Sequence, residues 1–580
     1  MHSQASAAAE KAVVAPYGSW ESPISAAAVS AAGRTVEGLA VAGDGRLLWV
    51  ETRPEEGGRA VLVKEAAEPG GDAVDVTPEG FAVRSLAQEY GGGAFAVQGD
   101  VVVFSNYSDQ RLYKQTIGDN SAQPLTPDYT GSVLRYADGV FDPHFCRYVT
   151  IMEDHRKDSS NPVTTIAAVT ISERDANEPT VLVSGNDFYA FPRIDPIKRR
   201  MAWIEWSNPN MSWDKAQLWV GYFSEKGEVH NKICIAGGDP TLVESPTEPK
   251  WTSKGELFFI TDRESGFWNI YKWDEESNLT VQLYSLDAEF SKPMWIFGVS
   301  SYGFLGKDDT SNKIVCCYRQ NGRSCAGVLD HDSGSFSELD IPFSSVTNIV
   351  SGDGFFYVEG ASATLPVSIA KSPARRLMLI SMPRTIIFSK GRQMRNLRYW
   401  SEPMVDLQMK HVEFWILVFS TGQAEDGHLL MLTMGEAQVE TGRVDAQRLC
   451  VTGESAGGFT TLACLAFRQI FKAGNRKAYF ERSPINFVDR FSCPIILFQG
   501  LEDTVVSPVQ ATTIYKAIKD KGLPVALVEY EGEQHGFRKA ENIKFTLEQQ
   551  MVFFARLVGH FKVADGITPI KIDNFDEPSL

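Results

Sequence analysis

The sequence predicts two successive folds: an all-β seven-bladed β-propeller followed by an α/β domain with a parallel sheet. Two observations predict them. Apolar, β-rich runs recur about every 50 residues between positions 30 and 370, and beyond residue 440 such runs alternate with amphipathic helical segments. At 580 residues, with 43% hydrophobic and 22% charged side chains, the chain is long enough to form at least two cores.

The propeller prediction depends on seven repeats. Each repeat contains an apolar run that ends in a polar tip, such as "GRLLWVETR" or "GELFFITDR", and several are followed by a second strand candidate such as "QLWVGYF". The runs are centred at Trp49, Phe104, Met152, Trp203, Phe259, Cys316 and Phe356. Seven strand-rich periods of this length indicate seven blades, and a pair of β-sandwiches is the alternative.

The C-terminal part has a different pattern, in which strand and helix candidates alternate. Strands are expected at 447–452, 493–500 and 524–532, and helices at 455–473, 508–522 and 546–561. Strands that alternate with helices form a parallel sheet covered by the helices. The expected layout is an N-terminal segment (1–29), the propeller (30–371), an atypical segment (372–440), the α/β part (441–565) and a tail (566–580).

A possible nucleophile lies in "VTGESAGG", where Ser455 stands between Gly453 and Gly457 after a strand and before a helix. This G-x-S-x-G frame is typical of the tight strand-to-helix turn of an α/β-hydrolase, whose crowded backbone requires small residues. The backbone N–H of Ala456 would then form half of an oxyanion hole. The alternative is that Ser455 only caps the helix.

Two further residues follow later strands in the order that this fold requires. Asp503 comes just after the strand at 493–500, and His535 comes just after the strand at 524–532. His535 would take the proton of Ser455, and Asp503 would orient the imidazole. Other carboxylates compete with Asp503, namely Glu502, Asp489 and Asp520, and His535 could instead be a surface loop residue. For His560, late in the last helix, interaction with the helix dipole is the simpler interpretation.

The blocks "VDAQRLCVTGESAGGFTTLACLAF", "CPIILFQGLEDTVVSP" and "YEGEQHGFRKAENI" resemble the catalytic blocks of the prolyl oligopeptidase family of serine peptidases. The branch is that of acylaminoacyl peptidases and dipeptidyl-peptidase-like enzymes of plant type. "APYGSWESPISA" is similar to the entry into the family's propeller, so the likeness covers residues 10–370 and 441–570. It implies hydrolysis of short peptides through an acyl-enzyme on Ser455, a propeller that restricts access, and no metal or organic cofactor.

The hydrolase part departs from the family pattern in two places. No "HGG" turn, which would complete the oxyanion hole, occurs in the sequence, and residues 372–440 contain seven of the 13 Met. We interpret this segment as mis-spliced or frame-shifted, with divergent strands as the alternative. No strand candidate occurs between 473 and 479, and residues 372–565 number 194, against about 240 for eight strand–helix units. The parallel sheet is therefore expected to be truncated.

Composition limits the remaining possibilities. The net charge of −17 argues against nucleic-acid binding, and no apolar run reaches the roughly 18 residues that span a membrane. The eight cysteines form no C-x-x-C pair, which favours reduced thiols in the cytosol; a removed organellar transit peptide and homo-oligomers stay open. A serine peptidase is the predicted function. The alternatives are a catalytically impaired relative that acts as a binding or subunit partner, and, less favoured, an esterase.

Overall fold

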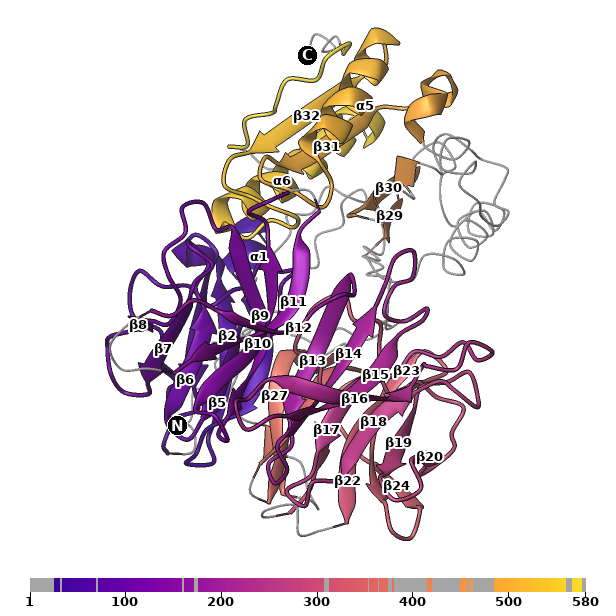
Figure 1. The fold of residues 1–580 in the computed structure, drawn as a ribbon. Helices are drawn as coiled ribbons and strands as arrows, with labels where there is room; N and C mark the ends of the chain where they lie inside the picture. Colours follow the sequence, from indigo (N-terminus) through magenta and orange to yellow (C-terminus); the bar gives the residue numbers. More distant parts are fainter. Residues whose placement is uncertain are drawn as a thin grey trace, which may run out of the picture. The chain divides into compact units, whose positions relative to one another are not determined.

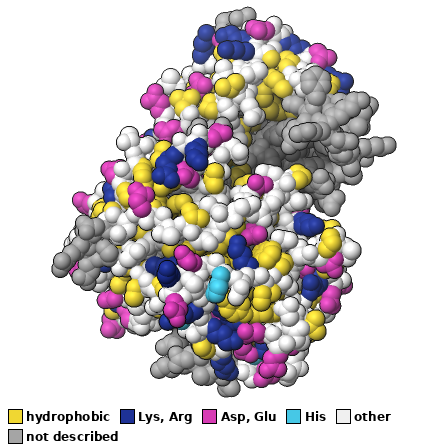
Figure 2. All heavy atoms as spheres, viewed as in Figure 1, with side chains coloured by type: hydrophobic (Ala, Val, Ile, Leu, Met, Phe, Trp, Pro, Cys, Tyr) yellow, Lys and Arg dark blue, Asp and Glu magenta, His cyan; other side chains and the backbone are white. Residues whose placement is uncertain are grey.

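The computed structural model describes most of the chain. The described residues are 25–31, 34–68, 71–158, 161–171, 176–306, 312–352, 354–362, 365–373, 378–379, 415–419, 449–455, 458, 461–462, 484–559 and 566–575. The chain forms two compact units: one is Arg34–Ile387, and the other combines Met1–Gly33 with Phe388–Leu580. Lys and Arg side chains are interspersed with Asp and Glu side chains on the face seen in Figure 2.

The first unit is a seven-bladed β-propeller, as the sequence predicts. Its described strands form seven four-stranded antiparallel sheets, each built from four consecutive strands (Figure 1). The first four blades contain β1 (Thr35–Val41), β2 (Leu47–Arg53), β3 (Arg59–Lys64), β4 (Val74–Asp75); β5 (Phe95–Gln98), β6 (Val101–Ser105), β7 (Leu112–Thr116), β8 (Gln123–Pro124); β9 (Leu134–Asp142), β10 (Arg147–Asp154), β11 (Val163–Thr170), β12 (Thr180–Val183); and β13 (Phe188–Ile194), β14 (Arg200–Trp206), β15 (Gln217–Phe223), β16 (Val229–Ala236). The last three contain β17 (Thr247–Trp251), β18 (Leu257–Thr261), β19 (Asn269–Asp274), β20 (Leu279–Gln282); β21 (Tyr302–Phe304), β22 (Lys313–Gln320), β23 (Arg323–Asp330), β24 (Ser335–Leu339); and β25 (Ser345–Gly352), β26 (Phe355–Ser362), β27 (Leu365–Pro373), β28 (Met378–Leu379).

The last blade ends later than the sequence indicates. "RLMLISM" (376–382) belongs to the atypical segment, for which divergent strands of the α/β part are the alternative interpretation; β28 within it pairs instead with β27 as the fourth strand of blade seven. Blade seven therefore continues past residue 371 to Leu379. The two-residue strand has no alternation of its own, so only its pairing with β27 identifies it.

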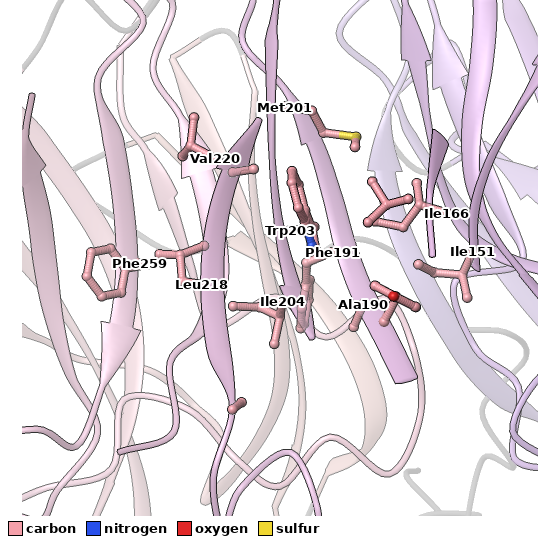
Figure 3. Close-up of a cluster of buried hydrophobic side chains, with 14 of the residues drawn as sticks. Ile151, Ile166, Ala190, Phe191, Met201, Trp203, Ile204, Leu218, Val220 and Phe259 are labelled. Atoms are coloured by element: carbon pink, nitrogen blue, oxygen red, sulfur yellow. The ribbon is translucent and has the colours of Figure 1, made fainter. Parts of the chain in front are cut away.

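Apolar clusters join neighbouring blades. The second strands of blades one and five, β2 and β18, are largely apolar and almost entirely buried. Figure 3 shows side chains from three consecutive blades meeting in one cluster: Ile166 from blade three, Trp203 from blade four and Phe259 from blade five. Trp203 is fully buried, and its indole N–H donates to Glu205 (2.8 Å), which satisfies the polar atom inside the core.

The seam between blades one and seven closes the propeller through side chains. Trp49 and Val61 of blade one pack with Tyr357 and Ile369 of blade seven. The Lys371 ammonium pairs with Glu65 (3.0 Å), and the Tyr357 hydroxyl donates to the carbonyl of Gly45 (3.0 Å). Each described sheet contains strands from only one stretch of the chain, so the seam has no strand pairing across it.

A segment that we call the axial strap, residues 291–299, joins blades that are not neighbours. It precedes β21 of blade six, yet the N–H of Phe297 donates to the carbonyl of Gly91 (2.9 Å), just before blade two, and Phe297 pairs with Gly92 in a parallel bridge. Because blades two and six lie three blades apart, the two segments can meet only over the propeller axis. Phe297 is 2% exposed and packs in the cluster of blades three to five.

The strap makes a prediction about Gly92, which has a φ of +85°. A Cβ at this position would overlap the carbonyl oxygen of Phe297. Gly92→Ala should therefore lower the free energy of unfolding by about 3 kcal/mol or more, from left-handed strain plus overlap. Gly80→Ala is the matched control, because Gly80 has the same φ and open space around its Cα. Equal losses in urea denaturation followed by tryptophan fluorescence would contradict the prediction.

A buried glutamate in blade seven should make the stability of the protein depend on pH. Burial raises the pKa of Glu359 to about 7 and Glu37 adds to the rise, against a hydrogen bond from Asn348 and the charge of Lys292. A carboxyl group with a raised folded-state pKa contributes stability below its ordinary value of 4.5, and this contribution is lost as the pH rises through about 7. Glu359→Gln should therefore stabilise the protein at pH 8 by on the order of 3 kcal/mol and much less at pH 5. Urea denaturation at both pH values measures this effect. The control Glu276→Gln, at an exposed position, should change the stability equally at pH 5 and pH 8. An equal effect of Glu359→Gln at both pH values would count against the prediction.

The second unit contains two described pairs of parallel strands. β29 (Trp415–Phe419) pairs with β30 (Leu449–Gly453), and β31 (Ile495–Gly500) pairs with β32 (Val525–Tyr530). Parallel pairing confirms the predicted type of sheet. β29 lies in the segment 372–440, for which divergent strands are the alternative interpretation.

Helices of this unit accompany the strands. They are α1 (Ala26–Ala31), η3 (Pro484–Arg490), α5 (Pro508–Asp520) and α6 (Ala540–Phe554), which continues as the π-turn η4 (Ala555–Gly559); a short helix, η1 (Pro54–Glu56), belongs to the propeller. α1 packs against α6, and α5 packs against β31 and β32. α6 begins six residues earlier than expected, because Lys539 at its start provides no side-chain cap that the sequence could reveal.

Much of residues 372–440, the expected gap at 473–479 and most of the helix expected at 455–473 lie outside the described residues. Gly458, Thr461 and Leu462 are described from that helix, and all three are helical. Leu462 packs in one apolar cluster with Ile495 of β31, Ile518 of α5 and Val525 of β32. None of the described helices combines the length and the apolar character needed to cross a membrane.

Candidate active site

Ser455 lies in the turn that follows β30, and its backbone has a φ of +54°. This left-handed conformation costs a residue with a side chain about 1–2 kcal/mol, and such strain often marks a functional position. The chain turns tightly here, because a Cβ on Gly458 would lie 3.3 Å from the carbonyl oxygen of Gly453. The turn therefore has the close backbone approach that the G-x-S-x-G frame predicts. Ala456 and Gly457 lie outside the described residues.

Asp503 lies in the turn that follows β31, and its side chain is 8% exposed. Its Oδ1 accepts hydrogen bonds from the backbone N–H groups of Val505 (2.9 Å) and Val506 (2.8 Å). These two bonds fix the plane of the carboxylate and leave Oδ2 directed at another partner. That partner is the Nδ1 atom of His535, at 2.9 Å.

His535 lies in the loop between β32 and α6, and its side chain is 19% exposed. Its Nε2 lies 2.8 Å from the Oγ of Ser455. A carboxylate only accepts hydrogen bonds, so the Nδ1 facing Asp503 carries the proton of the neutral ring. Nε2 is then the acceptor, and the hydroxyl of Ser455 donates to it. This arrangement can remove the serine proton during attack on a carbonyl carbon and stabilise the resulting imidazolium.

The competing carboxylates lie elsewhere. Glu502 is exposed next to Asp503, Asp489 lies in η3, and Asp520 is exposed at the end of α5. The carboxylate that hydrogen-bonds to the His535 ring is that of Asp503. His560 lies outside the described residues. The structure therefore brings together Ser455, Asp503 and His535, which come from three separate turns.

Gln499 is a residue near the site that the sequence analysis did not single out. It is the buried fifth residue of β31, and its side-chain amide donates to the carbonyl groups of Gly500 (2.9 Å) and Val506 (3.1 Å). The same amide lies 3.4 Å from Oδ2 of Asp503. Gln499 thus closes the turn that holds Asp503. A polar residue inside the apolar run "CPIILFQG" is the signal that could have indicated this role.

In the part of the chain that the structure describes, no three His, Cys, Asp or Glu side chains are grouped as they would be around a metal ion. The six cysteines whose side chains the structure describes are free thiols, and burial raises the pKa of Cys317 to about 12. A thiol with a raised pKa is a poor nucleophile. The nucleophile candidate with a neighbouring base is Ser455.

The family model described as "Prolyl oligopeptidase family" matches residues 431–476 and 474–561. These stretches contain Ser455, Asp503 and His535. A solved structure of a puromycin-hydrolyzing peptidase from Mycobacterium tuberculosis is 28% identical, with a TM-score of 0.82, and the alignment covers 97% of this chain and 100% of that one.

Over residues 431–561 the chain matches the prolyl oligopeptidase family. Two further relatives are similar over shorter stretches. A dipeptidyl peptidase family member 6 from Caenorhabditis elegans is 26% identical over 20% of this chain and 21% of its own length. A dipeptidyl aminopeptidase BIII from Pseudoxanthomonas mexicana is 33% identical over 14% of this chain and 12% of its own length. These matches thus span about a fifth and about an eighth of those two relatives.

The family match confirms the resemblance of the catalytic blocks seen in the sequence. The structural relative, aligned over 97% of this chain, also supports the prediction of a β-propeller followed by an α/β-hydrolase part. The described strands of the hydrolase part are β29 to β32, so the structure describes a small part of the sheet that an α/β-hydrolase contains.

The geometry predicts the effect of Asp503→Asn. Val505 and Val506 still require an acceptor, so the Asn oxygen stays with them and its NH₂ group faces His535. The proton then moves to Nε2, which can no longer accept the hydroxyl of Ser455. The rate at which a fluorophosphonate labels Ser455 should fall by about 10⁴-fold. Asp520→Asn, an exposed change in α5, should label at the wild-type rate. An unchanged rate in Asp503→Asn would contradict the assignment.

Proposed function

We propose that this protein is a serine peptidase that hydrolyses short peptides through an acyl-enzyme on Ser455. The observation that carries the proposal is the continuous hydrogen-bond chain from Asp503 through His535 to Ser455. The three residues lie within the stretches matched by the family model, so local geometry and the family match point to the same residues.

The proposed reaction has two halves. The Oγ of Ser455 attacks the substrate carbonyl carbon while Nε2 of His535 takes its proton, and the imidazolium then gives that proton to the leaving amine. Water, deprotonated by the same nitrogen, releases the acid product and restores the serine. We assign one donor of the oxyanion hole to the N–H of Ala456, the residue after the nucleophile.

We also propose that the propeller restricts the substrate to short peptides. The radial arrangement of the blades leaves only short, protected sheet edges, which gives an extended chain little backbone to pair with. The structural relative is described as puromycin-hydrolyzing, and the two shorter matches are dipeptidyl peptidases by name. Small amides with a free or blocked N-terminal residue are therefore the first substrates to test, because the sequence leaves acylaminoacyl and dipeptidyl specificity open.

A second candidate is a catalytically impaired relative that binds peptides or another subunit. The absence of an "HGG" turn from the sequence favours it, since that turn would supply the second donor of the oxyanion hole. Losing one such donor costs about 10²–10³-fold in kcat, which slows the reaction without abolishing it. An esterase is the third candidate, and short-chain esters assayed beside peptides separate it from a peptidase.

Ser455→Ala tests the proposal. The change removes the attacking oxygen, so kcat on puromycin and on dipeptidyl and N-acetyl aminoacyl arylamides should fall by about 10³-fold or more. Fluorophosphonate labelling should vanish at the same time. Ser333→Ala, an exposed serine in the propeller, is the matched control and should keep wild-type rates. Wild-type protein that is folded but neither labelled nor active on any of these substrates would instead establish the impaired relative.

A further inference from the structure

Glu533 is a buried carboxylate two residues before His535, in the loop between β32 and α6. It is 2% exposed. A carboxylate removed from water costs several kcal/mol unless hydrogen bonds replace its hydration. The roles proposed above for Asp503, His535 and Ser455 leave this group without a function.

Three donors surround the carboxylate, and all three follow His535 in the chain. Its Oε2 accepts from the backbone N–H of Arg538 (3.0 Å). Its Oε1 accepts from the backbone N–H of Lys539 (3.0 Å) and from the side-chain amide of Asn542 (2.9 Å). The bonds therefore run from one end of the loop to the other and to the first turn of α6, and they enclose the segment that contains His535.

The backbone of the same residue contacts the turn that contains Asp503. The carbonyl of Glu533 accepts from the N–H of Glu502 (2.9 Å), the residue before Asp503. A Cβ on Gly500 would lie 2.5 Å from that carbonyl oxygen, so the two turns touch without space for a side chain. Glu533 thus joins the His535 loop through its side chain and the Asp503 turn through its main chain.

We propose that Glu533 is a positioning residue that fixes His535 relative to Asp503 and Ser455. This inference rests on the proposed function. Glu533 contacts none of the reacting atoms, and it acts through the shape of the loop. Only a carboxylate suits the three donors, because both of its oxygens accept, whereas an amide would direct an NH₂ group at an N–H donor.

Glu533→Gln tests the proposal, with Glu531→Gln as the matched control, because Glu531 is exposed in the same loop. A displacement of His535 by about 1 Å should lower kcat by roughly 10- to 100-fold. KM should stay within about twofold, because substrate binding does not use this loop in the proposal. Amide hydrogen exchange of the peptide that contains residues 534–542 should become faster in Glu533→Gln and stay at the wild-type rate in Glu531→Gln.

Asn542→Ala is a milder second variant, which removes one of the three donors and leaves the buried carboxylate with two backbone partners. It should lower kcat and speed amide exchange in the same way but by less. A lost hydrogen bond that weakens the loop by about 0.7 kcal/mol corresponds to a fall in kcat of about threefold. Wild-type kcat in both variants, or faster exchange without any loss of kcat, would overturn the positioning role. A fall in kcat matched by an equal rise in KM would also overturn it. If the wild type is inactive, the proposed function fails, and the exchange rates alone decide whether Glu533 holds the loop.

Discussion

The site depends on the parallel register between β31 and β32. Gly500 at the end of one strand pairs with Tyr530 at the end of the other, so both chains leave the sheet at the same edge and level. The turn of Asp503 and the loop of His535 therefore begin side by side. A slip of one residue would move one loop by about 3.3 Å along the strand, more than a hydrogen bond between the two side chains can absorb. α6 is also linked to β30, the strand before Ser455, because the side-chain amide of Gln550 donates to the hydroxyl of Thr452 (2.8 Å).

The features that could be predicted from the sequence are those with a local signal. Seven apolar runs at a period near 50 residues indicate seven blades, because each blade must bury an apolar face against its neighbours. The glycines around Ser455 indicate a crowded turn, and the order of Ser455, Asp503 and His535 follows the order of strands in the fold.

The features that could not be predicted depend on contacts between distant segments. β28 is too short to show alternation and is defined by β27 alone. The early start of α6 has no sequence signal, because Lys539 provides no capping side chain. The backbone N–H of Lys539 donates instead to the carboxylate of Glu533, six residues earlier in the chain. Gln499 and Glu533 look like ordinary polar residues in the sequence, because their hydrogen-bond partners are set by how the turns fold back.

The axial strap has a mechanical consequence for the propeller. The seam between blades one and seven is held by side chains such as Lys371 and Glu65, and no pairing among the described strands crosses it. If the ring of blades parted at this seam, blades two and six would move apart as well. That motion would break the bond from Phe297 to Gly91 and the parallel bridge between Phe297 and Gly92. The strap therefore links two sides of the ring at a place distant from the seam, and it resists opening of the ring at that seam.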